Sequence, residues 1–340
     1  MSSLILSLQQ GLAITSEPYA QMGLSFGLTG DEVLAALAQF TVQGVARRFG
    51  AVFNVSQLGY QSALCAIQVS SARLEAVGAM LVPHPGITHC YSRSANDEHL
   101  PNLWFTLSTL AEHFAEELAR LQSQISEPIH VLPATRKFKV QVVLDPDQLQ
   151  SSLELDIELP AIGSHASPIV GSHVGPFVGT QAVATTQAER NLIRLLHQFP
   201  TVAKPFALIA SKLSLDESEV LTKLQTWKEL GVLRRIGLLV KHQQIGFVAN
   251  AMCTWQVAPE RVEAVGSKLA ARREITHCYE RSTFANFPYN IYAMIHSQSD
   301  MELKRLAQDI SQQIETPLGR MFMSEREFKK TSLVPFRMDD

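Results

Sequence analysis

The sequence ITHCYERSTFANFPYNIYAMIH occupies residues 275–296, and a related sequence, ITHCYSRSANDEHLPNLWFTLS, occupies residues 87–108. Both begin with Ile-Thr-His-Cys-Tyr-x-Arg. The same spacing of 188 positions relates Cys65 to Cys253 and Asn102 to Asn290, and a spacing of 187 relates the segments that begin at Asp31 and Ser218. A nearly constant offset over so long a stretch predicts two tandem copies of one structural unit.

Each copy is expected to begin with a winged helix-turn-helix. In the second copy, residues 188–200 and 204–215 have helical apolar spacing, and a third helix is expected between an N-cap at Asp216 and a stop at Gly231. The chain then becomes extended. Three short helices followed by an extended segment are typical of this DNA-binding motif.

A second module follows in each copy. In the second copy the pattern predicts strands over 248–257, 275–282, 289–297 and 318–329, with helices over 259–274 and 299–315. The order β-α-β-β-α-β indicates a ferredoxin-like fold. The predicted class is therefore α+β, a tandem duplication of a winged helix-turn-helix head and a ferredoxin-like domain.

The repeat also predicts the domain boundaries. The first head is expected over 1–48 and its ferredoxin-like domain over 49–144; the second head is expected over 187–235 and its domain over 236–340. Residues 145–186 are rich in Gly, Ser and Pro without helical or strand periodicity, which indicates a linker or an extended, wrapping segment. His165 and His173 lie in this segment and are interpreted as linker residues.

The composition excludes several classes of protein. The chain is 46% hydrophobic and 18% charged with a net charge of -3, so no general attraction to nucleic acid or anionic membrane is expected. There is no apolar run of spanning length and no signal-peptide pattern at the start, so we predict a cytoplasmic protein. The four cysteines form no C-x-x-C pair and are predicted to be buried, reduced thiols.

Two longer strings carry a family resemblance. A winged helix before a β-α-β-β-α-β module resembles the Lrp/AsnC family. Within it, GVLRRIGLLVKHQQIGFVANAM at 231–252, followed by HCYERS and PYNIYAMIH, resembles the siroheme decarboxylases more narrowly. These enzymes are pairs of Lrp-like subunits in haem d1 biosynthesis and in the alternative haem pathway. The resemblance covers nearly the whole chain except the linker, and two copies in one chain resemble a fused form.

The resemblance implies a function. The family removes carbon dioxide from the acetate side chains at C12 and C18 of siroheme, which gives 12,18-didecarboxysiroheme. It implies no external cofactor, because the iron tetrapyrrole is the substrate. Siroheme and its product are the implied ligands, with other haem d1 biosynthesis proteins as further candidate partners. Pairing of the two halves is expected within the chain, a homodimer of the fused chain is left open, and no DNA or membrane partner is expected.

The residues themselves point to carboxylate chemistry. Strand alternation places His277, Tyr279 and Arg281 on one face and Cys278 on the other. Imidazole, phenol and guanidinium groups can hold a carboxylate and deliver a proton to carbon. The first copy repeats this face with His89, Tyr91 and Arg93.

The second copy keeps more titratable groups than the first. His242 corresponds to Val55, Lys241 to Asn54, and His296 to Ser108, while Tyr292 and Tyr289 correspond to Trp104 and Pro101. We therefore expect the reaction in the second half, where His296 is a weaker candidate. Either His277 or His242 is expected to be the general acid and the other the axial ligand of the tetrapyrrole iron. The predicted catalytic residues are His277, His242 and Tyr279.

Siroheme carries eight carboxylates, so several cationic groups should bind it, with Arg favoured for bidentate contacts. The paired arginines at the junction of head and domain also have a simpler interpretation, in which they are solvated or join the two domains. The predicted substrate-binding residues are Arg234, Arg235, Lys241, Arg281, Asn290, His89, Arg47 and Arg48.

Two other functions remain open from the sequence: an Lrp/AsnC-type transcription regulator, and a non-catalytic tetrapyrrole carrier. A regulator needs basic groups on its recognition helix. The first head offers two acids and no base over 30–44, and the second balances Lys223 and Lys228 against four acids. Both helices are poorly suited to a DNA groove, so we interpret the heads as scaffolding.

Overall fold

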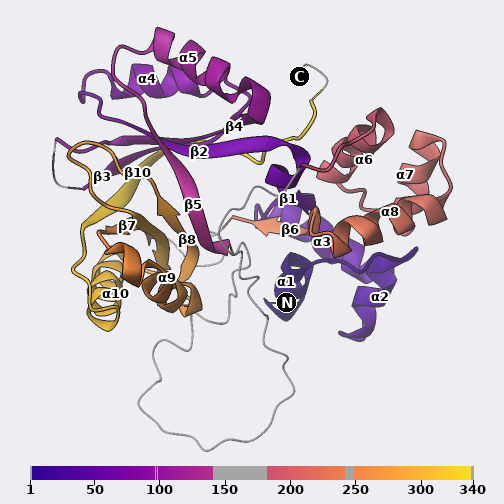
Figure 1. The fold of residues 1–340 in the computed structure, drawn as a ribbon. Coiled ribbons are helices and arrows are strands. Elements are labelled where there is room, and N and C mark those ends of the chain that lie inside the picture. The colour runs from indigo at the N-terminus through magenta and orange to yellow at the C-terminus, as the bar shows by residue number, and fades with distance from the viewer. Residues whose placement is uncertain (1, 96, 98, 141–181, 242–248, 338–340) are drawn as a thin grey trace, which may run out of the picture.

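The computed structural model describes residues 2–95, 97, 99–140, 182–241 and 249–337. These residues form a β-barrel flanked by helices and, beside it, a second body that contains both heads (Figure 1). The predicted α+β tandem duplication is confirmed.

Each head has three helices and a strand, as the repeat predicts. The first contains α1 (Ser2–Gln10), α2 (Pro18–Leu24), α3 (Gly30–Val42) and β1 (Ala46–Phe53); the second contains α6 (Gln187–His197), α7 (Pro205–Leu213), α8 (Glu217–Glu229) and β6 (Leu233–Val240). A capping box fixes the start of α3, where the Thr29 hydroxyl accepts from the Glu32 N–H and the Glu32 carboxylate accepts from the Thr29 N–H. Asp216 and Glu219 do the same for α8, so the predicted N-cap is confirmed.

The two heads share one hydrophobic core because β1 and β6 pair with each other as an antiparallel ribbon. At its centre Gly50 lies opposite Gly237. An added Cβ would lie 2.1 Å from the His197 carbonyl oxygen at Gly50 and 2.6 Å from the Leu8 carbonyl oxygen at Gly237. The ends of α6 and α1 therefore pack directly on the ribbon backbone. The predicted boundaries after residues 48 and 235 fall inside these strands, because both strands remain part of the head core to their ends.

The two ferredoxin-like domains close into a single eight-stranded barrel. The strands of the first copy are β2 (Tyr60–Ile67), β3 (Ile87–Ser94), β4 (Leu103–Leu110) and β5 (His130–Val140). Those of the second are β7 (Ala249–Trp255), β8 (Ile275–Arg281), β9 (Ile291–Ser297) and β10 (Arg320–Lys330). Around the barrel the order is β10-β3-β4-β2-β5-β8-β9-β7.

The last strand of each copy is shared between the copies. Residues 130–133 of β5 pair with β2 of their own copy, and residues 134–140 pair with β8 of the other. In β10, residues 320–323 pair with β7 and residues 323–330 pair with β3. Each copy therefore completes the sheet of the other, and the sequence periodicity alone could not show this exchange.

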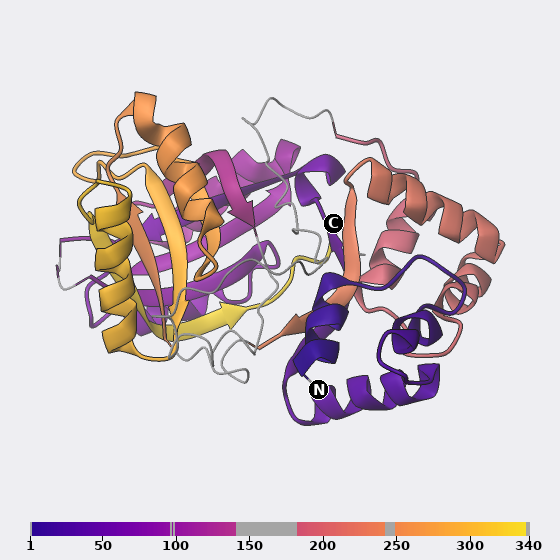
Figure 2. The same cartoon turned by 90° about the horizontal axis from the view of Figure 1, so that it is seen from below.

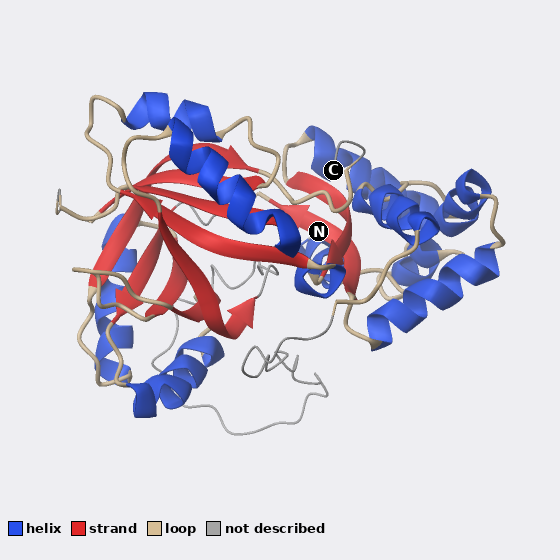
Figure 3. Cartoon of the chain, turned by 45° about the horizontal axis from the view of Figure 1, so that its top comes forward, coloured by secondary structure: helices blue, strands red, loops and turns tan. Residues whose placement is uncertain are grey.

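Four helices cover the outside of the barrel: α4 (Leu74–Leu81), α5 (Phe114–Gln124), α9 (Val262–Ala271) and α10 (Asp300–Gln313) (Figures 1 and 3). The shared strands contact helices of the opposite copy. An added Cβ at Gly266 in α9 would lie 2.3 Å from the ring of Phe138, and one at Gly78 in α4 would lie 2.5 Å from the ring of Phe328. The absence of a side chain at these glycines lets the exchanged aromatic rings pack against the helices.

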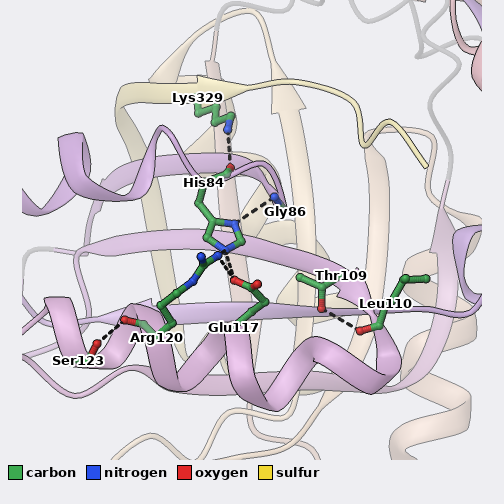
Figure 4. A network of polar contacts seen from close by, with 8 residues as sticks. All are labelled: His84, Gly86, Thr109, Leu110, Glu117, Arg120, Ser123 and Lys329. Atoms are coloured by element: carbon green, nitrogen blue, oxygen red, sulfur yellow. Dashed lines mark hydrogen bonds and ion pairs between the residues drawn. The ribbon is translucent and has the colours of Figure 1, made fainter. Parts of the chain in front are cut away.

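Polar contacts also fasten β10 to the first copy (Figure 4). Lys329 Nζ donates to the carbonyl oxygens of Val82 and His84 at 2.7 and 2.8 Å. His84 Nδ1 accepts from the Gly86 N–H, and its Nε2 lies 2.8 Å from the Glu117 carboxylate. Arg120 also contacts Glu117. These residues have a structural role in holding the loop before β3.

The interior of the barrel contains an aromatic cluster drawn from both copies. Trp104 and Phe322 are in edge contact with ring centroids 4.9 Å apart, and Phe287 packs against both rings. Tyr292, Leu132, Ala66 and Met252 complete the buried set. All four cysteines are free and buried, as predicted. The predicted linker lies mostly outside the described residues, as do His165 and His173. No described helix combines the length and apolarity needed to cross a membrane.

Candidate functional site

A β-bulge directs His277 into the barrel. Ile275 pairs with Ile295 and His277 with Met294, so Thr276 is the extra residue between them. Ile275 and Cys278 both pack in the core beneath the outer helices. The first copy has the same irregularity between Ile87 and His89.

Four side chains of three strands gather around His277. Its ring stacks on Tyr279 with centroids 6.2 Å apart, and the Arg281 guanidinium lies 4.6 Å from the Tyr279 centroid. Lys137 of β5 is in register with Tyr279. Arg234 of β6 interacts electrostatically with His277, Tyr279 and Lys137. We call these five residues the second-copy cluster.

The second-copy cluster is cationic. Burial, followed by the charges of Arg281, Arg234 and Lys139, lowers the pKa of His277 to about 4. Burial also raises the pKa of Tyr279, against the influence of the same two arginines. Every charged group that shifts the pKa of His277 is positive, so the substrate-free cluster favours an anion.

Arg234 is available for binding such an anion. The residue is accessible to solvent, although partial desolvation lowers the pKa of its guanidinium, and it forms no hydrogen bond or ion pair with the part of the chain that the structure describes. Arg281 is partly committed, because its Nη1 donates to the Leu132 carbonyl oxygen at 2.8 Å. Arg234 therefore has the freer guanidinium for a substrate carboxylate.

The first copy has an equivalent cluster with a different charge. His89 stacks on Tyr91, and Arg47 of β1 acts electrostatically on both. Here the residue in register with the tyrosine is Glu327. The Tyr91 hydroxyl donates to Glu327 at 3.2 Å, and Lys330 Nζ lies 4.0 Å from the same carboxylate. The first-copy cluster therefore carries its own anion.

The two clusters act on each other electrostatically, and both are approached from the head ribbon, which Figure 2 shows beside the barrel. Burial lowers the pKa of His89 to about 3, and the charges that contribute after burial are those of Arg47, Lys330, His277 and Arg93. The two repeated histidines therefore interact electrostatically across the copies. Arg47 and Arg234 reach these clusters from the paired strands β1 and β6.

The neighbouring arginines, which are two of the predicted substrate contacts, lie against the heads. Arg48 Nη1 donates to the His197 carbonyl oxygen, and its Nη2 donates to that of Ala51 at 3.0 Å. Arg235 packs beside Gly11 of the first head. Arg47 and Arg234 are the extra residues where the register of the β1–β6 pair shifts, whereas Arg48 and Arg235 are paired within the ribbon and contact the heads.

Asn290 also has a structural role that differs from its predicted one. Its Oδ1 accepts from the Val257 N–H at 2.8 Å, and its Nδ2 donates to the Val257 carbonyl oxygen at 2.9 Å. Asn102 makes the same pair of bonds to Val69. The repeat preserved this asparagine as a loop staple, so its predicted substrate contact is not supported.

The remaining candidates occupy different places. Lys241 is exposed at the end of β6, where its backbone N–H donates to the Val45 carbonyl oxygen. His242 lies outside the described residues. Tyr292 is buried in the barrel interior beside Phe287, and Tyr289 packs edge-on against the same ring. His296 contacts the Thr276 hydroxyl at 3.0 Å.

Sequence reasoning missed Lys137, Glu327, Lys330 and Thr276. The first three belong to the shared strands, and their place in the site depends on pairing between copies. The signal for Thr276 was present in the repeated Ile-Thr-His string, but a bulge was needed to turn it inward. The described residues contain no group of three or more His, Cys, Asp or Glu side chains that could hold a metal ion.

Comparisons with known proteins agree with this architecture. The AsnC-like ligand binding domain matches residues 57–139 and 244–329, and the siroheme decarboxylase NirDL-like HTH domain matches residues 189–234. A siroheme decarboxylase of Hydrogenobacter thermophilus is 32% identical over 332 residues, which cover 97% of this chain and 92% of the relative. The chain belongs to the siroheme decarboxylase family.

Solved structures of the siroheme decarboxylase family share the complete fold. The crystal structure of the siroheme decarboxylase NirDL has a TM-score of 0.72 at 28% identity, covering 99% of this chain and 94% of that one. A second NirDL structure, in co-complex with an iron-uroporphyrin III analogue, has a TM-score of 0.71 and covers 98% and 93%. The likeness to these decarboxylases therefore includes both heads and the barrel.

Proposed function

We propose that this chain is a siroheme decarboxylase that removes the C12 and C18 acetate carboxyls to give 12,18-didecarboxysiroheme in haem d1 biosynthesis. The observation that carries the proposal is the second-copy cluster. It places a histidine and a tyrosine among Arg234, Arg281 and Lys137, and no carboxylate contributes to the shift in the pKa of His277. Such a site suits a substrate with many carboxylates.

The cluster divides the reaction into binding and proton delivery. Arg234 and Lys137 hold peripheral carboxylates of the macrocycle. The reacting acetate lies beside His277 and Tyr279, away from bulk water. The bond between its carboxyl carbon and its methylene carbon breaks, carbon dioxide leaves, and the electron pair passes into the macrocycle. The methylene carbon then takes a proton from His277 and becomes a methyl group.

The iron belongs to the substrate and needs no separate cofactor in this proposal. With His277 as the acid, the predicted axial ligand becomes His242, which lies outside the described residues. The first-copy cluster, with His89 and Arg47, acts electrostatically on His277, so we assign it to the same binding region. Enzymes that supply siroheme and consume its decarboxylated product are the proposed partners.

The heads do not favour a regulatory role. Helix α3 contains no Lys or Arg, and its first turn carries Asp31 and Glu32. In α8, Lys223 is paired with Glu189 at 2.8 Å. Since β1 and β6 join the heads and deliver Arg47 and Arg234, we infer that the heads serve as scaffold and as part of the site.

The test is anaerobic incubation of the purified protein with siroheme, followed by mass spectrometry of the tetrapyrrole. Two successive losses of carbon dioxide are expected. Siroheme that remains bound and unchanged would indicate a carrier, and absence of binding would overturn both functions. A gel shift with DNA at physiological salt should be negative.

A further inference from the structure

Two histidines of the second copy are joined through one hydroxyl. Thr276 Oγ1 lies 3.0 Å from His277 Nδ1 and 3.0 Å from His296 Nε2. Thr276 is buried, whereas both histidine rings are only partly buried. A hydroxyl can donate one hydrogen bond and accept another. The Thr276 hydroxyl can therefore accept from one ring and donate to the other, so that both hydrogen bonds run in the same direction.

The bulge in β8 creates this arrangement. It turns Thr276 to the same side as His277, while His296 reaches the hydroxyl from the end of β9. The His296 backbone N–H donates to the Glu274 carbonyl oxygen at 3.1 Å, which fixes the end of β9 next to the bulge. The backbone of β8 and β9 therefore fixes the relative positions of Thr276, His277 and His296.

The first copy has only one of these two hydrogen bonds. Thr88 Oγ1 lies 3.0 Å from His89 Nδ1, as in the second copy. However, Ser108 replaces His296, and its hydroxyl lies 2.7 Å from that of Ser62 instead. The second imidazole is therefore specific to the copy that carries the cationic cluster.

His277 needs an external proton source if it acts as the acid. In the substrate-free site its lowered pKa keeps the ring neutral near pH 7. A neutral imidazole that gives up its Nε2 proton becomes an imidazolate unless its other nitrogen is protonated at the same time. Nδ1 faces the Thr276 hydroxyl, which can supply that proton.

We propose that Thr276 and His296 form a proton relay that recharges His277 during decarboxylation, a role that rests on the proposed function. They are positioning residues, since neither touches the reacting carbon in this arrangement. The His277 Nε2 proton passes to the methylene carbon as carbon dioxide leaves. The Thr276 hydroxyl proton moves to His277 Nδ1, and the His296 Nε2 proton moves to Thr276 Oγ1.

The charges balance in this step. An imidazolium at His296 becomes a neutral imidazole, Thr276 remains a neutral hydroxyl, and His277 changes from one neutral tautomer to the other. After the product leaves, a solvent proton binds His277 Nε2, the Nδ1 proton of His277 returns to Thr276, and the Thr276 hydroxyl proton returns to His296 Nε2, which restores all three groups. No oxidant or reductant takes part.

The test compares kcat and KM of full-length variants with anaerobic siroheme. Thr276→Val keeps the shape of the side chain but removes the hydroxyl, and kcat should fall by at least about tenfold with little change in KM. Thr276→Ser should restore kcat to within about twofold of the original value. His296→Ala should show the same loss as Thr276→Val, and added imidazole should recover part of it. Ser108→Ala, at the matching position of the first copy, should leave kcat unchanged.

The outcomes separate the relay from the function itself. If Thr276→Val decarboxylates siroheme at the original kcat, the relay is wrong and the proposed function stands. The same conclusion follows if imidazole fails to rescue a folded His296→Ala variant that still binds siroheme. If Thr276→Val does not fold, the imidazole rescue decides. If the unmodified protein releases no carbon dioxide, the proposed function fails first.

Discussion

Lys137 lies opposite Tyr279 across the seam between β5 and β8. The matching seam between β10 and β3 places Glu327 opposite Tyr91. The two positions are related by the repeat but carry opposite charges. The barrel therefore presents one cationic cluster and one that contains its own carboxylate, although the two share the same His-Cys-Tyr-x-Arg strand.

This charge difference predicts the effect of Lys137→Glu. Placing a carboxylate beside Tyr279 should repel the peripheral carboxylates of siroheme and weaken binding by about tenfold or more, equivalent to about 1.4 kcal/mol. Titration of siroheme absorbance would measure the Kd. Lys268→Glu changes the same charge on the exposed face of α9 and serves as the control. Equal losses in both variants would mean that only net charge matters.

Neighbouring arginines should separate binding from stability. Arg234→Gln should raise the Kd for siroheme. It should leave the free energy of unfolding nearly unchanged, because the Arg234 side chain forms no hydrogen bond or ion pair with the described residues. Arg48→Gln should lower the free energy of unfolding by about 1–3 kcal/mol, since it leaves carbonyl groups of His197 and Ala51 without their donor. Denaturant titration and siroheme binding together test both. If Arg48→Gln lost siroheme binding without any loss in the free energy of unfolding, Arg48 would be a substrate contact and this assignment would be wrong.

The asparagine staples predict matched losses of stability. Asn290→Ala and Asn102→Ala each remove two hydrogen bonds to one backbone residue, Val257 or Val69. Each should lower the free energy of unfolding by about 1–3 kcal/mol. For Asn290→Ala, KM for siroheme should stay the same when measured well below the unfolding transition. A stable variant with a raised KM would restore the predicted substrate contact.

Stability should fall in mild acid because desolvation lowers the pKa of three histidines. The pKa values of His277 and His197 are lowered to about 4 and that of His89 to about 3, all first by burial. An unfolded histidine titrates near 6.5, so the unfolded state binds more protons between about pH 6.5 and 4. The free energy of unfolding should therefore decrease as pH falls through this window. Above the window, the contribution of these neutral histidines to stability is complete.

Denaturant titrations at pH 7.5 and pH 5 would measure this dependence. The variant His277→Asn should lose less stability between the two pH values than the unmodified chain. A neutral asparagine cannot take up the proton that favours the unfolded state. An identical pH dependence in both proteins would show that His277 does not contribute.

Much of the fold could be predicted from the sequence because the repeat and the strand and helix periodicities are local signals. The face shared by His277, Tyr279 and Arg281 also followed from strand alternation. The exchange of β5 and β10 could not be predicted, since it depends on which edges meet in three dimensions. Lys137 and Glu327 were missed for that reason.

The structural contacts of Arg48, Arg235 and Asn290 were missed for another reason. Residue type suggested affinity for carboxylates, but the actual partners are backbone carbonyl and amide groups. Arg47 and Arg234 are the extra residues at two register shifts of the β1–β6 ribbon, so strand alternation alone could not have separated them from Arg48 and Arg235. Asn102 is the counterpart of Asn290 in the first copy, which lacks several of the titratable groups of the second. An asparagine that is kept without those groups indicated a structural role.

The shared strands also impose an order on synthesis. When the first half leaves the ribosome, β3 is paired with β4 on one edge only and the end of β5 has no partner, because β10 and β8 lie far downstream. At about 5–20 residues per second, the interval before β10 emerges is roughly 10–40 s. During that time the nascent chain presents open strand edges, which can join other chains. Closure of the barrel ends this exposure, so the last strand to be made also protects the first half from aggregation.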